Sequence, residues 1–585
     1  MPDLDASPRR RLRRLLALAV VAAVVAGWGA MAVDRARAAD ADARQGLGLA
    51  RQAEGDLGGP TVLSQRAVAG LLARSGKLFA AAGADLASWW LAPAGAVPLL
   101  DRQLATARDL AAAAGQVVGV AQVAVERLGA AGAGSHLSGA AGIALLRRLA
   151  TVTGGAAQAL GGLDLGDPSL LVGPVARTRG KVAAEIGRMR RRLEETSSLA
   201  AASATLLQGP STVLVLAANN AEMRSGSGAF LEAGTIQLDN GHARFGAMTQ
   251  TAALLLPGHG VPISGDFAAR WGWMEPNVEW RDLGLTPDFP TTAALAARMW
   301  QAKTGQRVDA VVSVDVDAIA SLLAATGPVR SGGQSVTAAN VIPLLLHDQY
   351  VGLAPSAAAQ ASRQDRLGAL AAGVLAAATS GRVPAAALAS ALSQAAAGRH
   401  LMVWSDQSAA EGAWAASGAG GAAPGNGIMV SVINRGANKL DPYLPVTCRL
   451  AVAPRGGSTE VTIDVTLANR APPGLPPYIT GTEAGLALPP GGYEGILSFN
   501  LPGRARQASV TGYRTLGAAG PEGPMSVLAV PVDVAQGSTR HYQAVFDLAG
   551  RHGSVTVMPS ARIPAESWTY GTHHFLDTDS HSLSW

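Results

Sequence analysis

The polar segment at residues 219–228, Asn-Asn-Ala-Glu-Met-Arg-Ser-Gly-Ser-Gly, carries the side chains of this chain that are best suited to chemistry. It follows an apolar run at residues 213–217, which is typical of a buried strand. Ligands of open α/β sheets bind beyond the carboxyl ends of the strands. Arg224 could hold a phosphate through two parallel hydrogen bonds, and the glycines would let backbone N–H groups approach an anion. The segment therefore predicts an anion site; the alternative is a structural turn in which Glu222 and Arg224 pair with neighbours.

Two further polar sets could complete such a site. The loop at residues 257–290 contains Glu275, Asn277, Glu279, Trp280, Arg281, Asp282 and Asp288. Mg²⁺ prefers oxygen ligands, so we expect Glu222 and Asp288 to hold this ion if the site is catalytic. Residues Arg363 and Arg366, in an Arg-Gln-Asp-Arg run that starts a predicted helix, would add cations. A soluble loop and a surface helix are the plain alternatives.

Other catalytic arrangements find little support in the sequence. Cys448 is the single cysteine, so no intramolecular disulfide can form, and its apolar, strand-like surroundings predict a small buried side chain. Three histidines near the C-terminus match no known metal-site spacing. A hydrolase that used Ser227 would need a nearby histidine, for which His242 and His259 are the local candidates.

The N-terminal residues predict a membrane anchor. Five arginines within residues 1–14 precede an uncharged run, Leu15–Val33, and roughly 20 apolar residues cover the ~30 Å core of a bilayer. Because positive residues favour the cytoplasmic side, we expect a cytoplasmic tail at 1–14, a single transmembrane helix at 15–33 and the bulk of the chain outside the cell membrane. A cleaved signal peptide is the alternative, although its apolar region is normally about 7–15 residues long.

The charge balance argues against a nucleic-acid partner. The net charge is +5, and residues 1–14 contribute five arginines and two aspartates, or +3, which leaves +2 for the remainder. A net charge of +2 over the remainder is too small for the basic surface of a nucleic-acid-binding protein.

Residues 34–208 are predicted to form a helical stalk or bundle. Apolar residues recur at steps of three and four along Leu100–Leu128, and Val182–Leu206 forms another helix. The polar side of the second helix is dense in charge, with Lys181, Arg188, Arg190, Arg191, Arg192, Glu194 and Glu195. A solvated face is the plain interpretation, and contact with an anionic lipid or polymer is the alternative.

The rest of the chain divides by its pattern of strands and helices. In residues 209–424 strands alternate with helices, including a hairpin whose Asn240-Gly241 turn suits type I′ geometry, so we predict an α/β domain. In residues 425–562 short strands separated by Pro and Gly turns predict an antiparallel β-sandwich. Residues 563–585 are expected to be a polar tail.

Several motifs resemble a family of membrane proteins of unknown function, numbered 4012, that is common in actinobacteria. They are Leu214–Phe230, residues 287–290 (Pro-Asp-Phe-Pro), residues 305–311 and 315–329, and residues 438–444 (Asn-Lys-Leu-Asp-Pro-Tyr-Leu). The resemblance covers about residues 85–560, and the family has no assigned activity.

The middle region is also distantly similar to the LytR–CpsA–Psr domain. Residues 304–309 and 325–329 match its strand and helix outline, and Arg363 begins an Arg-Gln helix like one in that family. The resemblance implies transfer of a glycopolymer from a polyprenyl pyrophosphate to the cell wall, with arginines on the pyrophosphate and acidic residues on Mg²⁺. However, the family's Ser-Ile-Pro-Arg-Asp segment is missing and Pro328 replaces a glycine.

Two functional hypotheses follow. In the first, the α/β domain binds a polyprenyl-linked envelope glycan and transfers it; Arg224, Arg363 and Arg366 neutralise the pyrophosphate, while Asn219 and Asn220 contact the ligand and Glu222 and Asp288 hold Mg²⁺. In the second, the protein is a non-catalytic structural protein of the cell surface that binds wall polymer or another protein. Clustering of the named charged residues in one cleft would favour the first.

Overall fold

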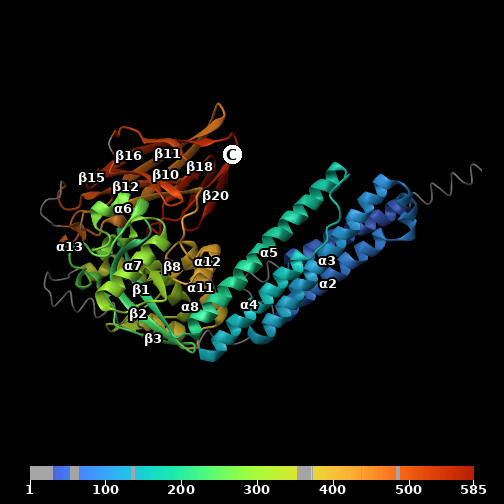
Figure 1. Cartoon of the computed structure of the whole chain (residues 1–585), viewed down its shortest axis with the longest axis horizontal. Coiled ribbons are helices and arrows are strands. Elements are labelled where there is room, and N and C mark those ends of the chain that lie inside the picture. Colours follow the sequence, from blue (N-terminus) through green and yellow to red (C-terminus); the bar gives the residue numbers. More distant parts are fainter. Residues whose placement is uncertain are drawn as a thin grey trace, which may run out of the picture. The chain divides into compact units, whose positions relative to one another are not determined.

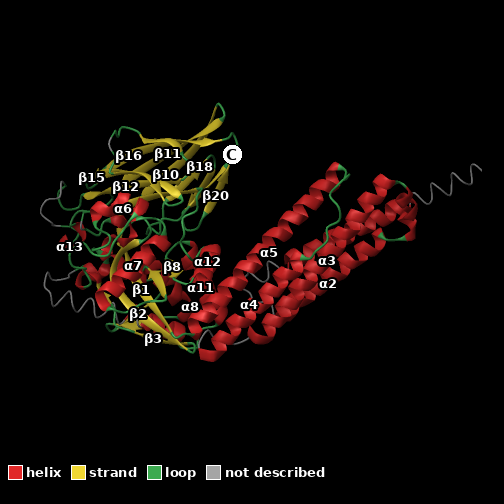
Figure 2. Cartoon of the chain, in the orientation of Figure 1, coloured by secondary structure: helices red, strands yellow, loops and turns green. Residues whose placement is uncertain are grey.

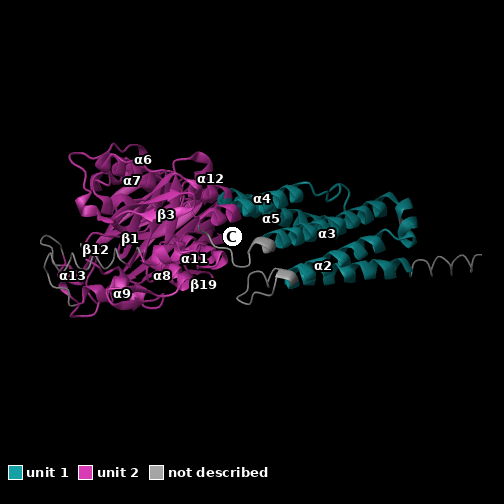
Figure 3. Cartoon of the chain, turned by 90° about the horizontal axis from the view of Figure 1, so that it is seen from below, with its two compact units in different colours: residues 1–133, 147–200 teal, residues 134–146, 201–585 magenta. Residues whose placement is uncertain are grey.

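The computed structural model describes residues 31–52, 65–132, 139–351, 370–371, 373–436, 438–481, 488–514 and 516–585. The chain divides into two compact units, one made of residues 1–133 and 147–200 and the other of residues 134–146 and 201–585 (Figure 3). Figure 2 shows that helices make up the first unit, whereas strands and helices are combined in the second.

The first unit is built from long, alanine-rich helices. After a helix over residues 31–52 come α2 (Gln65–Leu86), the 3-10 helix η1 (Trp89–Ala96), α3 (Pro98–Gly132), α4 (Gly139–Gly161) and α5 (Gly173–Gln208). The helices predicted at Leu100–Leu128 and Val182–Leu206 lie inside α3 and α5 (Figure 1). Helix α2 packs on α3 around a small core of Val68, Leu71, Leu72, Phe79 and Val118.

The prediction of a membrane-spanning helix is corrected by the structure. Within the ranges described, no helix has both the length and the apolar composition needed to cross a membrane. The helix over residues 31–52 contains seven charged side chains, Asp34, Arg35, Arg37, Asp40, Asp42, Arg44 and Arg51, and burying such charges in hydrocarbon is costly. Most of the predicted span, residues 15–30, lies outside the described residues. The localisation to a cell membrane through a single-pass anchor is therefore not supported.

The second unit begins with a six-stranded mixed sheet. Its strand order is β3-β2-β1-β5-β8, and β4 also pairs with β2. The bounds are β1 Ser211–Met223, β2 Gly228–Asp239, β3 His242–Phe245, β4 Thr249–Gln250, β5 Ala310–Val314 and β8 Leu401–Ser405. The predicted hairpin is confirmed, because Asn240 and Gly241 connect β2 to β3 with φ values of 51° and 77°. Both are positive, as a type I′ turn requires.

Only one strand pair in this sheet is parallel. Strands β1 and β5 run parallel, whereas β2 and β8 are antiparallel to their neighbours. The α/β prediction is therefore corrected to a mixed sheet. A tight turn at residues 224–227 joins β1 directly to β2, and so short a connection permits only antiparallel pairing.

Helices and short elements fill the remainder of this region. They are η2 Thr251–Ala253, α6 Gly265–Trp271, η3 Gly272–Met274, η4 Trp280–Leu285, α7 Phe289–Thr304, α8 Val316–Thr326, the β6–β7 hairpin (Val329–Ser331 and Gln334–Val336), α9 Val341–Leu346, η5 Asp348–Tyr350, α11 Ala385–Ala397 and α12 Ser408–Ser417. Helix α7 begins after the capping side chain of Asp288 and ends at Gly305, which has a φ of 76°. These are the usual signals for a helix start and stop.

The C-terminal strands form two further six-stranded sheets. Their orders are β13-β16-β11-β10-β18-β19 and β14-β15-β12-β9-β17-β20. The bounds are β9 Gly427–Asn434, β10 Val446–Arg455, β11 Ser458–Ala468, β12 Tyr493–Pro502, β13 Arg506–Val510, β14 Ala518–Glu522, β15 Met525–Val534, β16 Thr539–Ala549, β17 Ser554–Val557, β18 Ser567–Tyr570, β19 His573–Leu576 and β20 His581–Ser584, with η6 Asp441–Tyr443 and α13 Pro477–Thr480 between strands.

The prediction of a purely antiparallel β-sandwich is wrong, because each of these sheets is mixed. Strand β10 pairs in parallel with β18, and β9 pairs in parallel with β17. Both parallel pairs arise because two strands near the C-terminal end, β17 and β18, pair with β9 and β10, which come first in sequence in these sheets. Residues 563–585, which were expected to be a polar tail, contain β18, β19 and β20.

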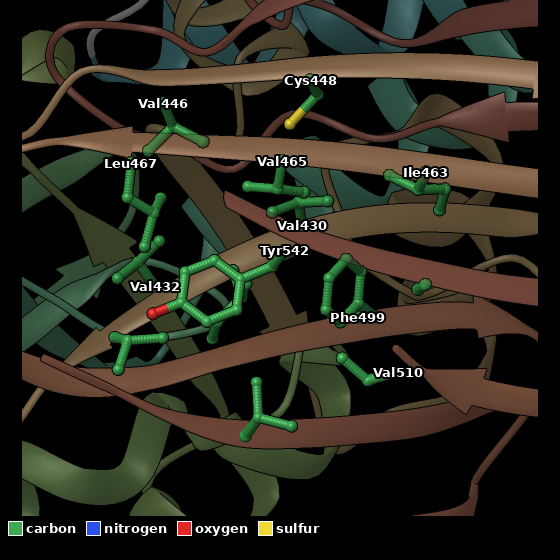
Figure 4. Close-up of a cluster of buried hydrophobic side chains, with 14 of the residues drawn as sticks. Val430, Val432, Val446, Cys448, Ile463, Val465, Leu467, Phe499, Val510 and Tyr542 are labelled. Atoms are coloured by element: carbon green, nitrogen blue, oxygen red, sulfur yellow. The ribbon is translucent and has the colours of Figure 1, made fainter. Parts of the chain in front are cut away.

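Side chains from both C-terminal sheets share one hydrophobic core. Cys448 is fully buried in it, as its alternating neighbours predict, and Phe499 from the other sheet belongs to the same cluster (Figure 4). Burial raises the pKa of the Cys448 thiol well above its ordinary value, so this side chain acts as a small hydrophobe. A second core joins the first sheet and α7 to Ile433, Ile496 and Val527 of the C-terminal strands.

Candidate functional site

The polar segment singled out in the sequence forms the end of β1 and the turn after it. Strand β1 pairs with β5 only from Val213 to Ala217. Beyond that point it continues past the parallel pair, with irregular pairing to β2, and contacts η6 and β9 of the C-terminal part. The polar side chains of this end therefore face other parts of the protein rather than solvent, and nearly all of residues 218–228 are buried.

Arg224 is held by three acceptors. Its Nε donates to Asp282 Oδ1 at 2.8 Å, and its Nη1 donates to the carbonyls of Met223 and Asn434, both at 3.0 Å. The residue is only 9% exposed. A buried guanidinium has to be paired in this way. The bonds use three of its five N–H donors, so a paired grip on phosphate would have to break at least one of them.

Glu222 pairs with Lys439, whose ammonium also lies near two tyrosine rings that stack on each other. The Lys439 Nζ is 5.4 Å from the ring centre of Tyr350 and 4.8 Å from that of Tyr478, and it donates a hydrogen bond to Glu222 Oε1. Burial by itself would raise the pKa of the Glu222 carboxyl, but the charge and hydrogen bond of Lys439, together with the charges of Arg224 and Arg281, outweigh burial and the pKa is lowered. Burial would lower the pKa of Lys439, but the charge and hydrogen bond of Glu222, together with Tyr350 and Tyr478, raise it. Both groups are therefore ionised near neutral pH.

The two asparagines also have protein partners. Asn219 Oδ1 accepts from the backbone N–H of Ala221 at 3.1 Å, and its amide nitrogen lies 3.4 Å from Tyr350 Oη. Asn220 Nδ2 donates to Asp315 Oδ2 at 2.7 Å and to the carbonyl of Ala561 at 2.8 Å. The segment around Ala561 comes from the C-terminal part of the chain, so it covers the carboxyl end of β1.

Asp315 and His400 form a buried pair beside Asn220. Asp315 caps α8, since its Oδ1 accepts from the backbone N–H groups of Asp317 and Ala318. Its Oδ2 is 2.7 Å from His400 Nδ1, and His400 Nε2 is 3.7 Å from Asp317 Oδ2. Burial would lower the pKa of His400, but Asp315 and Asp317 raise it to about 9. The imidazole is therefore protonated at neutral pH and serves as a fixed cation.

Asp441 joins the end of β1 to the C-terminal strands. Its Oδ2 accepts from the backbone N–H of Met223 at 3.0 Å and from Asn434 Nδ2 at 2.8 Å. Its Oδ1 accepts from Tyr493 Oη and from Arg562 Nη1, both at 2.9 Å. The side chains of Asp441 and Arg562 are each 1% exposed. This carboxylate is thus saturated by donors from four separate segments.

The remaining predicted site residues do not join this network. Asp288 caps α7 through Thr291, and its second oxygen accepts from the backbone N–H of Ala423 at 3.1 Å. Within the described ranges no hydrogen bond or ion pair links Asp288 to Glu222 or Arg224. Residues Arg363 and Arg366 lie outside the described residues.

These carboxylates fit a magnesium site poorly. The oxygens of Asp288 already accept from N–H and hydroxyl groups, and Glu222 neutralises a lysine. A cation there would have to displace Lys439 and strip the cap from α7. Among the described residues, no three His, Cys, Asp or Glu side chains are grouped so that they could hold a metal ion.

Sequence reasoning missed the partners that decide what this segment does. Lys439 and Asp441 stand more than 200 residues away from the β1 end in the chain, so no local pattern joins them to it. Asp315 did carry a signal, because an aspartate between an apolar strand and a helix is the usual N-cap. His400, directly before β8, had no such signal.

Of three comparisons with known proteins, one found a match, and it covers only the middle of the chain. A search of curated proteins found no match, and neither did a search of solved structures. A family model, however, matches residues 208–350, which run from the end of α5 to η5. This region contains the β1 end, Asp315 and Tyr350, but not His400, Lys439 or Asp441. Over those residues the chain matches the family described as "Protein of unknown function (DUF4012)", which supports the family resemblance seen in its motifs.

Proposed function

We propose that this protein is a non-catalytic structural or binding protein, in which residues 201–585 form a rigid part and the helical unit offers a surface to a partner. The observation that carries the proposal is that the β1-end side chains are bonded to residues from other segments of the protein. Arg224, Glu222 and Asn220 each meet partners inside the protein.

The transfer hypothesis needs these groups to be free. A pyrophosphate held by Arg224 through two parallel hydrogen bonds would have to replace Asp282 or at least one of the two backbone carbonyls. Separating a buried charge from its partner costs about 3–5 kcal/mol, and a ligand would have to offset that for both Arg224 and Glu222. The distant similarity to the LytR–CpsA–Psr domain supports a shared outline, whereas the occupied side chains favour a chain that binds without chemistry.

A thermal-shift titration of the full chain tests the proposal. The ligand is farnesyl diphosphate, with and without Mg²⁺, added to the wild type, to Arg224→Lys and to the exposed control Arg449→Gln. We expect no stabilisation beyond that of an equal concentration of inorganic salt in any of the three. Mg²⁺-dependent stabilisation that disappears in Arg224→Lys and persists in the control would overturn the proposal and restore the transferase hypothesis.

A further inference from the structure

The charged side of α5 stands out among the surfaces of the helical unit. The helix contains seven Lys and Arg residues and three Glu residues, a net charge of 7 − 3 = +4. At about 100° per residue, one arc of about 100° contains Glu195 and five of the basic residues: Arg177, Lys181, Arg188, Arg191 and Arg192. All five are exposed. We call this set the basic stripe of α5.

The opposite side of α5 is the one that packs on the rest of the unit. Val182, Ile186 and Leu193 lie there and are half-buried, and Ser197 Oγ donates to the carbonyl of Ala150 in α4 at 2.7 Å. The apolar side chains of α5 therefore pack within the helical unit, and the basic stripe faces solvent.

Most of the basic stripe forms no ion pair in the described structure, even with Glu195, which lies one turn beyond Arg191 and Arg192. Arg188 pairs with Glu185 one turn away. In the described part of the chain no ion pair reaches Arg177, Lys181, Arg191 or Arg192. Like charges this close on one helix face repel each other by a few tenths of a kcal/mol per pair. An extended anion would relieve this repulsion.

We propose that the basic stripe binds a flexible, phosphate-bearing anionic polymer. From Arg177 to Arg192 the stripe extends about 22 Å at 1.5 Å per residue, which is longer than one phosphate group and suits several along a chain. Four of its five side chains are arginines, which hold phosphate through paired hydrogen bonds.

The composition of α5 favours such a polymer over two other polyanions. The helix has no Phe, Trp or Tyr, whereas single-stranded nucleic acid binds through bases stacked on aromatic rings. Helices that lie on lipid expose a broad apolar face opposite their cations, but here that face is packed against the unit. This inference deepens the proposed function by naming a class of partner, and it concerns a surface separate from the β1 end.

Salt-dependent binding of linear inorganic polyphosphate tests the inference. The variant neutralises four stripe residues, Arg177→Gln, Lys181→Gln, Arg191→Gln and Arg192→Gln. The matched control neutralises four exposed arginines of other elements, Arg74→Gln, Arg127→Gln, Arg449→Gln and Arg470→Gln, so both proteins lose the same net charge. Circular dichroism verifies that both stay helical.

Counterion release sets the expected magnitude. At roughly 0.7 ions per contact, four contacts make the affinity fall about 50-fold between 50 and 200 mM salt. We expect the stripe variant to lose this dependence, so that its log–log salt slope is smaller by roughly 3, while the control keeps it.

Three results would overturn the inference: no polyphosphate binding by the wild type at 50 mM salt, equal weakening in variant and control, or tighter binding of single-stranded DNA or of anionic vesicles than of polyphosphate at matched charge. None of these depends on the diphosphate titration of the β1 end, so either proposal can fail alone.

Discussion

Replacing Asp441 with alanine should destabilise residues 201–585 more than any exposed substitution there. The change leaves the guanidinium of Arg562 buried without its carboxylate, and it removes the acceptor for Met223 N–H, Asn434 Nδ2 and Tyr493 Oη. Breaking a buried ion pair from one side costs about 3–5 kcal/mol.

For a unit of this size such a loss lowers the Tm by roughly 6–10 °C, at about 2 °C per kcal/mol. The change can be followed by tryptophan fluorescence, because Trp271, Trp280 and Trp568 are all fully buried within this part of the chain. Asp533→Ala, at an exposed position on β15, is the matched control.

The double variant Asp441→Ala, Arg562→Met separates the two causes of destabilisation. If the unpaired guanidinium dominates, replacing it with an apolar side chain should recover part of the lost Tm. A single variant that unfolds within about 2 °C of the Asp533→Ala control would refute the argument that this buried network holds the β1 end to the C-terminal strands.

Two further predictions concern pH. The pKa of His400 is raised from 6.5 to about 9, so its stabilising charge is fully present below about pH 6.5 and is lost as the pH rises through 9; we expect up to about 3 kcal/mol of wild-type stability to disappear between pH 6 and pH 10. His400→Gln should flatten that part of the stability profile from chemical denaturation, and an unchanged profile would contradict it. Burial raises the pKa of Glu522 from 4.5 to about 7, so ionising it destabilises the fold as the pH rises from about 4.5 through 7. Glu522→Gln should therefore be more stable than the wild type at pH 8, by up to about 3 kcal/mol, and equally stable at pH 4.5; a variant that is less stable at both would show that the wild-type carboxylate is favourable.

The candidate site illustrates how a plausible motif can be structural. A strand end with Asn, Glu, Arg and Gly is the composition expected of an anion site, and the same groups are also what a buried junction needs, because polar side chains inside a protein must find partners. Which of the two applies depends on what covers the strand end. Here residues near Asp441 and Ala561 cover it.

The sequence by itself determined most of the local structure. Helix α7 with its Asp288 cap and Gly305 stop, the Asn240-Gly241 hairpin and the alternating strands around Cys448 follow from short-range rules of capping, turn geometry and side-chain period. These rules act over a few residues, so they can be applied to the chain without its fold.

Only the tertiary structure decided how sheets are completed and what the polar segment does. The parallel pairings of β18 and β17 involve strands more than 100 residues away from their partners in sequence, and Lys439 meets Glu222 across 217 residues. Backbone hydrogen bonding and charge pairing are satisfied equally well by many distant partners, so no local pattern selects among them. The selection is made by burial of the shared cores, which is a property of the whole chain.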